Sequence, residues 1–488
     1  MTRVLFVSAE LAPFAKSGGL ADVCAALPAA LRRIGIDCRV LVPGYPAVRA
    51  AITDSQDVVH LEAHAALPAA RIVQGTLAGL PAFVVQCDTL YDRDGGPYQD
   101  ATGHDWPDNA FRFALLSRAA AFASGPTAPL GWPVQIVHAN DWPTGLTATY
   151  LYFDDGPKAG TVFTIHNAAY QGSFDKDLVA ALGLPWSCFD MHGAEFHGRL
   201  SFLKAGLYYA DHLTTVSPTY AEELQTEALG HGLHGLLHGR RHRLTGILNG
   251  IDVDVWNPAT DRHIARRYTR WTLGAKRHNK ADLQRHLGLA VNPELPLFGM
   301  VGRLVPQKGV DLLLEILPDL LNFPAQLAVV GTGEVSLERA LQAAAAREAG
   351  RVGVSIGFDE RLAHRVEAGA DFFLMPSRFE PCGLTQMYSQ RYGTPPIVHA
   401  TGGLADSVVP CTPPTLAAGI ATGFQFRPCG AVSLLAAAQN ASAVFKRRRE
   451  YRAMQRAGMR WDFGWEAGAR SYARLYRLFT GENARRDR

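Results

Sequence analysis

Short apolar segments alternate with amphipathic segments along almost the whole 488-residue chain. In the first half the apolar segments cover residues 4–8, 38–42, 82–86, 134–138, 161–165 and 212–216. Most of the intervening stretches have helical periodicity, for example residues 19–33 and 109–123. Strands that alternate with helices in this way predict parallel β-sheets with helices on both faces. The chain therefore belongs to the α/β class.

The same pattern starts again in the second half of the chain. Its apolar segments cover residues 297–301, 325–331, 351–356, 371–375 and 395–399, and helical segments such as 310–320 and 336–349 follow several of them. A turn-rich stretch between Asn249 and Pro258 separates the halves. Because one hydrophobic core stops growing near roughly 250–300 residues, we predict two α/β domains, 1–248 and 249–464. Residues 465–488 are predicted to form a C-terminal helix, and the pattern does not decide whether it packs back on the first domain.

The composition excludes several classes of protein. The formal net charge is only +3, so the short basic runs 446–449 and 485–488 are predicted to be solvated surface and not a nucleic-acid site. The seven cysteines are widely spaced without a C-x-x-C pair, which is typical of free thiols in a reducing compartment. No apolar run approaches the ~20 residues of a membrane span, and the first residues lack the charged n-region and long apolar core of a secretory signal. We expect a cytoplasmic protein without a membrane partner; composition does not indicate its oligomeric state.

Glycine-rich turns join predicted strands to predicted helices at residues 16–20, 381–385 and 401–404. In such a turn the backbone N–H groups and the start of the following helix favour anions. For any one of these turns, the steric need for glycine is the better explanation. Their comparable positions, at strand ends where α/β sheets bind ligands, favour phosphate binding. Neither a P-loop nor the G-x-G-x-x-G fingerprint is present.

Two cations follow the apolar segment 297–301. Arg303 stands at the predicted strand end and Lys308 just before the next helix, so both can reach one point in an interdomain crevice. A departing nucleoside diphosphate needs such cationic stabilisation, although a surface pair is the alternative. Residues 252–254 have the D-x-D pattern of some metal-binding transferases, but they lie in a turn without further oxygen ligands. We therefore predict no metal site and no cofactor.

Two further segments end predicted strands and carry groups suited to sugars. Residues 138–142 read HANDW, and residues 166–172 read HNAAYQG. Sugar hydroxyls bind to planar groups that both donate and accept hydrogen bonds, and sugar rings stack on aromatic side chains. These segments therefore predict contact with a carbohydrate.

Together these motifs resemble those of the bacterial glycogen synthase and plant starch synthase family. The matching segments, in family order, are KSGGLADV (16–23), YDRDGGPYQD (91–100), HANDW (138–142), HNAAYQG (166–172), NGID to WNP (249–258), GRLVPQKG (302–309), EPCGLTQ (380–386) and TGGLADSV (401–408). The resemblance implies the GT-B fold, two Rossmann-like domains facing a deep interdomain cleft. It also implies metal-independent, retaining transfer of glucose from ADP-glucose to the non-reducing end of an α-1,4-glucan, with release of ADP.

The resemblance further implies residue roles. The catalytic set is His166, Arg303, Lys308 and Glu380, and the donor-binding set is Lys16, Gly18, Gly19, Tyr98, Asp141, Asn167, Cys382, Gly383, Leu384 and Thr385. In the family pattern Arg303 and Lys308 neutralise the leaving diphosphate, and Glu380 hydrogen-bonds the donor glucose. Tyr388 stands near the position where many other retaining GT-B enzymes carry a second glutamate. This favours front-face departure and attack over a double displacement.

Alternative functions remain open at this level. The spacing of residues does not separate ADP-glucose from UDP-glucose as the donor. A glucan phosphorylase-like enzyme would share the fold but requires a pyridoxal phosphate lysine and usually a far longer chain. A non-catalytic glucan- or nucleotide-binding protein is the third possibility, but a decayed site should have lost Arg303, Lys308 or Glu380, and all are present.

Overall fold

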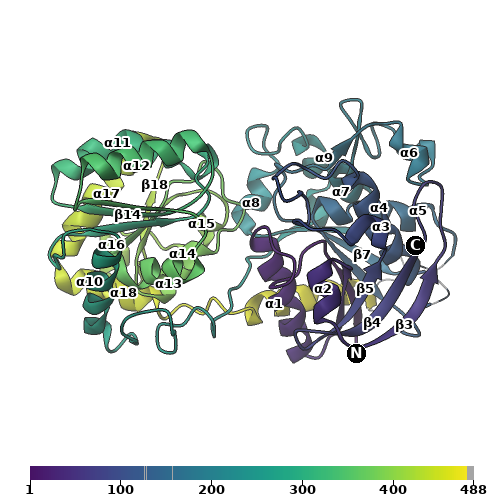
Figure 1. Cartoon of the computed structure of the whole chain (residues 1–488), viewed down its shortest axis with the longest axis horizontal. Helices are drawn as coiled ribbons and strands as arrows, with labels where there is room; N and C mark the ends of the chain where they lie inside the picture. Colours follow the sequence, from purple (N-terminus) through teal and green to yellow (C-terminus); the bar gives the residue numbers. More distant parts are fainter. Residues whose placement is uncertain (126, 128, 157, 481–488) are drawn as a thin grey trace. The chain divides into compact units, whose positions relative to one another are not determined.

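The computed structural model describes residues 1–125, 127, 129–156 and 158–480. The chain divides into two compact units (Figure 1). Unit 1 comprises Met1–Gly250 together with the segment from Trp465 onward, and unit 2 comprises Ile251–Gly464. Each unit contains its own sheet and its own hydrophobic core.

Unit 1 is built on a nine-stranded sheet in the order β12-β11-β7-β6-β1-β2-β5-β4-β3. The strands are β1 (Arg3–Val7), β2 (Asp37–Pro43), β3 (Thr53–Leu61), β4 (Ala70–Leu77), β5 (Leu80–Gln86), β6 (Ile136–Asn140), β7 (Gly160–Ile165), β11 (His212–Thr215) and β12 (Leu244–Gly246). The strands from β12 to β5 are parallel, and β3 and β4 extend the sheet as an antiparallel hairpin. Every strand predicted for this half is present.

Helices cover both faces of this sheet. They are α1 (Gly19–Arg33), α2 (Pro46–Ala51), α3 (Asp88–Tyr91), α4 (Asn109–Ala123), α5 (Leu146–Phe153), α6 (Leu178–Ala181), α7 (Phe202–Tyr209), α8 (Pro218–Glu223), α9 (His234–Gly239) and α19 (Glu466–Thr480). The helix pair α1 and α19 packs together, and α5 packs between α4 and α7 (Figure 1). A small antiparallel sheet of β8 (Ser173–Phe174), β9 (Glu195–Phe196) and β10 (Arg199–Ser201) lies apart from the main one.

Unit 2 is built on a six-stranded parallel sheet in the order β15-β14-β13-β16-β17-β18. The strands are β13 (Leu297–Val301), β14 (Gln326–Gly331), β15 (Val352–Ile356), β16 (Phe372–Met375), β17 (Pro396–His399) and β18 (Phe424–Phe426). The helices are α10 (Lys276–His286), α11 (Val310–Asn322), α12 (Val335–Arg347), α13 (Glu360–Gly369), α14 (Thr385–Arg391), α15 (Gly402–Ser407), α16 (Pro413–Ala417), α17 (Ala431–Lys446) and α18 (Arg448–Gly458). Helix α11 covers one face of the sheet and α13 the other (Figure 1).

The apolar segments form the central strands of each sheet, where side chains are buried on both faces of the sheet. The side chains of Val4–Val7 in β1 are fully buried, and so are those of Leu327–Val329 in β14. A strand enclosed between two helix layers requires a continuous apolar run, which is the pattern in the sequence. The predicted α/β architecture is confirmed in both halves.

Each sheet has a point where the strand order reverses. In unit 1 the chain runs outward from β1 through β2 on one side and from β6 through β7 on the other. In unit 2 the equivalent point lies between β13 and β16. In open α/β sheets, ligands bind outside the carboxyl ends of the strands at such a switch point. The topology therefore indicates where functional residues should be sought in each unit.

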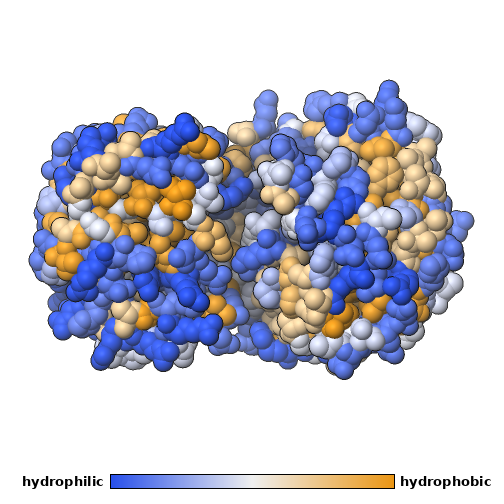
Figure 2. Space-filling view, in the orientation of Figure 1, coloured by the Kyte–Doolittle hydropathy of each residue, from blue (hydrophilic) through white to orange (hydrophobic). Residues whose placement is uncertain are grey.

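The surface in view is mostly hydrophilic, and its hydrophobic atoms form separate small patches (Figure 2). No helix among the described residues has both the length and the apolar character needed to cross a membrane.

Candidate active site

A salt bridge stands at the switch point of unit 2. Lys308 Nζ lies 2.5 Å from Glu380 Oε2, and Ser377 Oγ donates a second hydrogen bond of 3.2 Å to the same oxygen. Lys308 comes from the turn after β13, and Glu380 from the loop after β16. The Glu380 side chain is only 9% exposed, so its carboxylate requires a paired cation. Two residues predicted to be catalytic are therefore in direct contact.

The backbone after Lys308 has no room for a side chain. Gly309 has φ of +71°, and a Cβ atom built on it would lie 2.2 Å from the carbonyl oxygen of Pro376. The backbone N–H of Arg378 also donates to the Gln307 carbonyl at 2.8 Å. Glycine thus lets the turn carrying Lys308 pack directly on the loop that carries Glu380, and any larger residue would separate the two.

Arg303 belongs to the same turn as Lys308. Its side chain is exposed, and its guanidinium lies 3.5 Å from Gln307 Oε1. The structure therefore brings both predicted cations to the carboxyl end of β13, as the sequence indicated.

The glycine-rich turns of unit 2 pack against each other. A Cβ atom on Gly402 would lie 2.0 Å from the Glu380 carbonyl oxygen, and one on Gly403 would lie 2.1 Å from that of Cys382. The N–H of Gly403 donates to the carbonyls of Glu380 and Pro381 at 3.2 and 3.1 Å. The turn at 401–404 therefore supports the backbone around Glu380, and this close packing accounts for its two glycines.

The predicted donor-binding residues of the loop after β16 lead into α14. The side chain of Cys382 is buried. Gly383 has φ of +67°, Leu384 immediately precedes the helix, and Thr385 is its first residue. Gln386 Nε2 donates to the carbonyls of Cys382 and Gly383 at 3.1 and 3.0 Å, which fixes the path of the loop.

In unit 1 a buried carboxylate organises the first glycine-rich turn. Glu10, which follows β1, is 3% exposed. Its oxygens accept hydrogen bonds from Ser17 N (2.8 Å), Ser17 Oγ (2.9 Å), Gly18 N (3.3 Å) and Tyr98 Oη (2.8 Å). The turn and Tyr98, both predicted to contact the donor, are thus held by one residue that the sequence motifs did not identify. An acidic residue just after the first strand, opposite a glycine-rich turn, was the available signal.

The other predicted residues of this turn lie beside that network. Lys16 Nζ is 2.8 Å from Asp22 Oδ1, and both side chains are at least one-third exposed. Gly19 is the first residue of α1. The N–H groups of Ser17 and Gly18 donate to Glu10. The anionic group bound by this turn is therefore the Glu10 side chain of the protein itself.

Replacing Glu10 by glutamine is expected to lower kcat about tenfold. The amide keeps the shape but has one acceptor oxygen instead of two, so it releases Ser17, Gly18 or Tyr98. Hydrogen bonds to a charged group contribute about 1.5–3 kcal/mol. Steady-state kinetics and thermal unfolding would be measured together, with the exposed Glu62→Gln as the matched control. Unchanged kcat with a lowered Tm would show that Glu10 serves stability alone.

His166 is held in one tautomer at the carboxyl end of β7. Its Nε2 lies 3.0 Å from Asn140 Oδ1. The amide of Asn140 cannot turn around, because its Nδ2 donates to the carbonyls of Val7 (3.1 Å) and His138 (3.2 Å). Nε2 therefore carries the proton and Nδ1 is an acceptor. Burial lowers the pKa of His166 to about 3, so the ring is neutral and suited to accept a hydrogen bond from a hydroxyl.

Asp141 lies at the carboxyl end of β6, beside His166. It is 7% exposed and has φ of +60°, an uncommon backbone conformation for a residue with a side chain. Among the described residues no hydrogen-bond partner is found for its Oδ1. Burial raises the pKa of Asp141 to about 7, and hydrogen bonds from the backbone of Trp142 and other residues oppose that shift. A buried carboxylate oxygen with no partner, at a switch point, is a strong candidate for ligand contact.

Other members of the predicted sugar-binding segments have different surroundings. His138 is fully buried; its Nδ1 lies 2.7 Å from Tyr476 Oη of α19, and its Nε2 lies 2.6 Å from Thr164 Oγ1. Trp142 packs on Phe113 and Tyr98, with ring centroids 4.9 and 5.8 Å away. These two side chains therefore stabilise unit 1. Asn167 follows His166, and its Oδ1 accepts the N–H of Ala169 at 3.1 Å.

The aspartates of the D-x-D pattern form a turn, as the sequence analysis favoured. Asp252 Oδ1 accepts the backbone N–H groups of Asp254 and Val255 at 2.9 and 3.0 Å. Within the described parts of the chain, no three His, Cys, Asp or Glu side chains are grouped so as to hold a metal ion.

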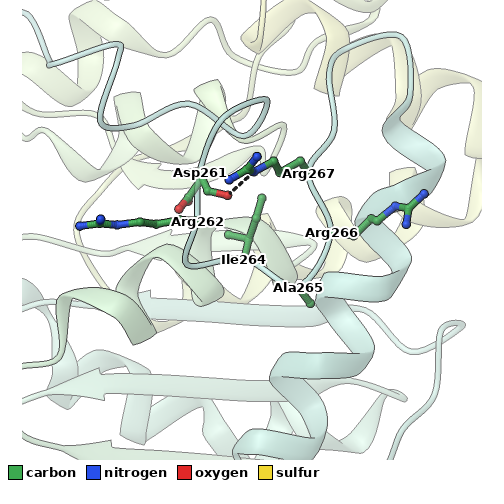
Figure 3. A pocket seen from close by; sticks show the side chains of 6 residues that line it. All are labelled: Asp261, Arg262, Ile264, Ala265, Arg266 and Arg267. Carbon is green, nitrogen blue, oxygen red and sulfur yellow. Dashed lines mark hydrogen bonds between the residues drawn. The ribbon is translucent and has the colours of Figure 1, made fainter.

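A cavity of about 400 Å³ lies elsewhere in unit 2. It is lined by Asp261, Arg262, Ile264, Ala265, Arg266 and Arg267. Figure 3 shows Arg262 and Arg266 pointing away from each other, while Arg267 Nε donates to the Asp261 carbonyl at 3.0 Å. The Asp261 carboxylate accepts a 2.6 Å hydrogen bond from Tyr392, just beyond the carboxyl end of α14. The cavity therefore lies near the end of α14 opposite Thr385, and its arginines do not converge on one anion.

The chain is similar to known proteins over almost its whole length. The family model of the starch synthase catalytic domain matches residues 3–239, and that of glycosyl transferases group 1 matches residues 287–427. The glycogen synthase of Nitrosomonas eutropha is 50% identical over 99% of this chain and 97% of its own length. That of Aromatoleum aromaticum is 52% identical over 97% of this chain and 96% of its own length.

Two solved structures share the fold of this chain. The catalytic domain of starch synthase IV from Arabidopsis thaliana, bound to ADP and acarbose, superposes with a TM-score of 0.88 at 31% identity, covering 98% of this chain and all of that one. Sucrose-phosphate synthase from Thermosynechococcus elongatus shares the fold, with a TM-score of 0.61 at 19% identity, 98% coverage of this chain and 99% of that one. The chain therefore belongs to the bacterial glycogen synthase and plant starch synthase family of GT-B glycosyltransferases.

Proposed function

We propose that the protein transfers glucose from ADP-glucose to the non-reducing end of an α-1,4-glucan, with retention of configuration and release of ADP. The observation that carries this proposal is the Lys308–Glu380 pair at the switch point of unit 2, with Arg303 on the same turn. A cation beside a buried carboxylate suits a donor that has both a diphosphate and a sugar. The glycogen synthases and the ADP-bound starch synthase among the relatives support this donor and acceptor.

The diphosphate is assigned to the cationic turn. Lys308 and Arg303 neutralise the charge that develops on the leaving group, and the backbone of residues 383–385 at the start of α14 caps a phosphate. In unit 1, we assign donor contacts to Lys16, Gly18, Gly19 and Tyr98. Phe358, which follows β15 and is 82% exposed, presents a ring for the nucleoside base. Stacking on phenylalanine does not itself distinguish adenine from uracil.

Each unit carries hydrogen-bonding groups suited to glucose. Glu380 accepts a hydrogen bond from a glucose hydroxyl, and Asp141 offers its Oδ1 to another. The neutral His166 accepts through Nδ1, and Asn167 donates through its amide. Each of these contacts satisfies a buried or half-buried polar group, so the sugar replaces the hydrogen bonds of water.

We assign front-face chemistry to the transfer. The bond from the glucose C1 to the diphosphate breaks, and ADP leaves with the electron pair. The acceptor hydroxyl oxygen bonds to C1 from the same face, and its proton passes to the departing phosphate. Tyr388, near the position where a second glutamate stands in many related enzymes, is stacked on Trp256 at 3.9 Å. A tyrosine packed in this way favours a route without a carboxylate nucleophile.

An assay with two donors tests the function. Purified protein is expected to lengthen glycogen with ADP-glucose, with and without excess EDTA, and much more slowly with UDP-glucose. Preference for UDP-glucose would contradict the donor assignment, and loss of transfer in EDTA would contradict a metal-independent reaction. Release of glucose 1-phosphate from glycogen and phosphate, with a pyridoxal absorbance band, would favour the phosphorylase-like alternative. Absence of glucose transfer from either donor would favour the third alternative, a non-catalytic binding protein.

We also propose that the protein works in the cytoplasm. All seven cysteines are free thiols, and five of them are buried. Free thiols are typical of a reducing compartment, which is where nucleotide sugars would be available to it.

A further inference from the structure

Arg378, two residues before Glu380, joins the loop after β16 to the start of α11. Its Nη1 and Nη2 atoms donate to Asp311 Oδ1 and Oδ2 at 2.8 and 2.6 Å. Nη1 also donates to the carbonyl of Pro306 at 2.5 Å. This two-point contact between a guanidinium and a carboxylate joins segments that are 67 positions apart in the sequence. Both terminal nitrogens of Arg378 are therefore engaged by the protein itself.

The backbone of the same residue makes a further contact. The Arg378 N–H donates to the Gln307 carbonyl at 2.8 Å. Pro306 and Gln307 immediately precede Lys308 in the short turn before α11. Arg378 therefore binds the carbonyls of both residues before Lys308, and its carboxylate partner Asp311 follows Lys308 by three positions.

Asp311 is well placed to receive the guanidinium. It lies in the first turn of α11, where the helix dipole favours a carboxylate. The hydrogen bonds from Arg378 hold the pKa of the Asp311 carboxyl below its usual value. The two side chains are 40% and 41% exposed, and an exposed ion pair by itself adds little to the stability of a fold. The main consequence of the contact is therefore geometric, because it fixes where the turn lies on the loop.

The position of this turn sets the position of Lys308. The Lys308 Nζ atom reaches Glu380 Oε2 only while the turn and the loop keep their present distance. Loss of the Arg378 guanidinium removes a donor to the Pro306 carbonyl and leaves the turn free to shift. Because displacement of a catalytic group by about 1 Å can lower a rate about 100-fold, such a shift matters more for the reaction than for the fold.

We propose that Arg378 is a positioning residue for glucose transfer. Through Pro306 and Asp311 it holds the turn that carries Lys308 against the loop that carries Glu380. The inference rests on the proposed function, which gives Lys308 its role at the leaving diphosphate. Arg378 acts through the position of Lys308 and not through a bond to the substrate.

Arg378→Gln and Asp311→Asn break the contact from opposite sides. Each is expected to lower kcat about tenfold, because Lys308 is displaced from the leaving diphosphate. The KM for ADP-glucose should change little, since the charge that Lys308 stabilises grows only as the diphosphate leaves. ADP carries that charge in full, so its dissociation constant, measured by calorimetry, should rise about fivefold. Arg378→Lys keeps the charge without the two-point geometry and should give an intermediate kcat.

A double-mutant cycle separates positioning from stability. In the Lys308→Ala background, Arg378→Gln should lower kcat no further, since the group that it positions is absent. The fall in Tm caused by Arg378→Gln should be the same in both backgrounds, because the hydrogen bonds of Arg378 do not involve the Lys308 side chain. Arg448→Gln is the matched control and should have wild-type kcat. It removes an exposed guanidinium that lies 2.6 Å from Glu294, across 154 positions of the sequence.

Wild-type kcat in both Arg378→Gln and Asp311→Asn would overturn the proposal. A loss of kcat from Arg378→Gln that persists in the Lys308→Ala background would also overturn it, because the effect would then not pass through Lys308. If the wild type binds ADP but transfers no glucose, the proposed function fails and the ADP dissociation constant still tests the role of Arg378. Unchanged ADP affinity in both variants would then refute that role.

Discussion

Replacement of Lys308 by alanine is expected to lower kcat by at least ~100-fold, the effect of removing one oriented group that stabilises transition-state charge. The Nζ atom is held 2.5 Å from Glu380 Oε2 in a turn that packs on Pro376, so its position is fixed before the substrate binds. The charge on the leaving diphosphate grows during the reaction, and the loss should therefore appear in kcat more than in KM.

Loss of Lys308 also leaves the Glu380 carboxylate buried without its cation, which could unfold the loop and mimic a catalytic effect. The double variant Lys308→Met/Glu380→Gln separates these causes, because it removes both charges while keeping similar volumes. Its Tm should recover toward that of wild type, but its kcat should stay at least ~100-fold low. Recovery of both Tm and kcat would mean that the Lys308–Glu380 pair only stabilises the fold. Arg347→Ala, an exposed cation on α12, is the control and should be active.

Replacement of Asp141 by asparagine is expected to stabilise the protein at pH 8 and to lower kcat roughly 10–100-fold, since hydrogen bonds to charged groups are worth about 1.5–3 kcal/mol. Burial raises the pKa of Asp141 from 3.8 to about 7 in the folded chain. The folded state therefore holds this proton more tightly than the unfolded state, and wild type loses stability as the pH rises from about 4 to about 7. Asparagine tolerates a positive φ as aspartate does and carries no charge to bury.

The unfolding free energy of both proteins would be measured from pH 4 to pH 8. The advantage of Asp141→Asn should be near zero at pH 4, grow with pH and level off above pH 7, reaching at most roughly 4 kcal/mol. The exposed Asp154→Asn is the control and should give no such pH dependence. A difference in unfolding free energy that stays constant from pH 4 to pH 8 would contradict the burial of a charged Asp141. So would an Asp141→Asn variant that is less stable than wild type at pH 8.

The sequence correctly predicted the strands whose side chains are buried along the whole strand. The central strands are buried on both faces and read as continuous apolar runs, so β1 and β14 were recognised from their residues alone. The hairpin of β3 and β4 was missed, because β3 lies at the edge of the sheet with mostly exposed side chains. An edge strand with one solvated side has no apolar run to reveal it.

At the candidate site, contacts between residues that are far apart in the sequence could not be predicted either. The pairing of Lys308 with Glu380 was not readable from sequence, because 72 positions separate them. Arg303 and Lys308 lie on one short turn after β13, which follows from their spacing, and their convergence on one ligand stays a prediction. Glu10 was missed although its place just after the first strand was a signal, because its partner Tyr98 lies 88 positions away in the sequence.

The sequence by itself determined the α/β class, the family and the turns that carry the cations, since periodicity and motif order are local properties of the chain. The tertiary structure decided what each polar side chain does. It placed His138 in the core against Tyr476, and it used Gly402 and Gly403 to support the Glu380 loop. It also left Asp141 buried with an oxygen that has no hydrogen-bond partner among the described residues. Burial and hydrogen-bond partners set the charge and orientation of a group, and both depend on segments that are distant in the chain.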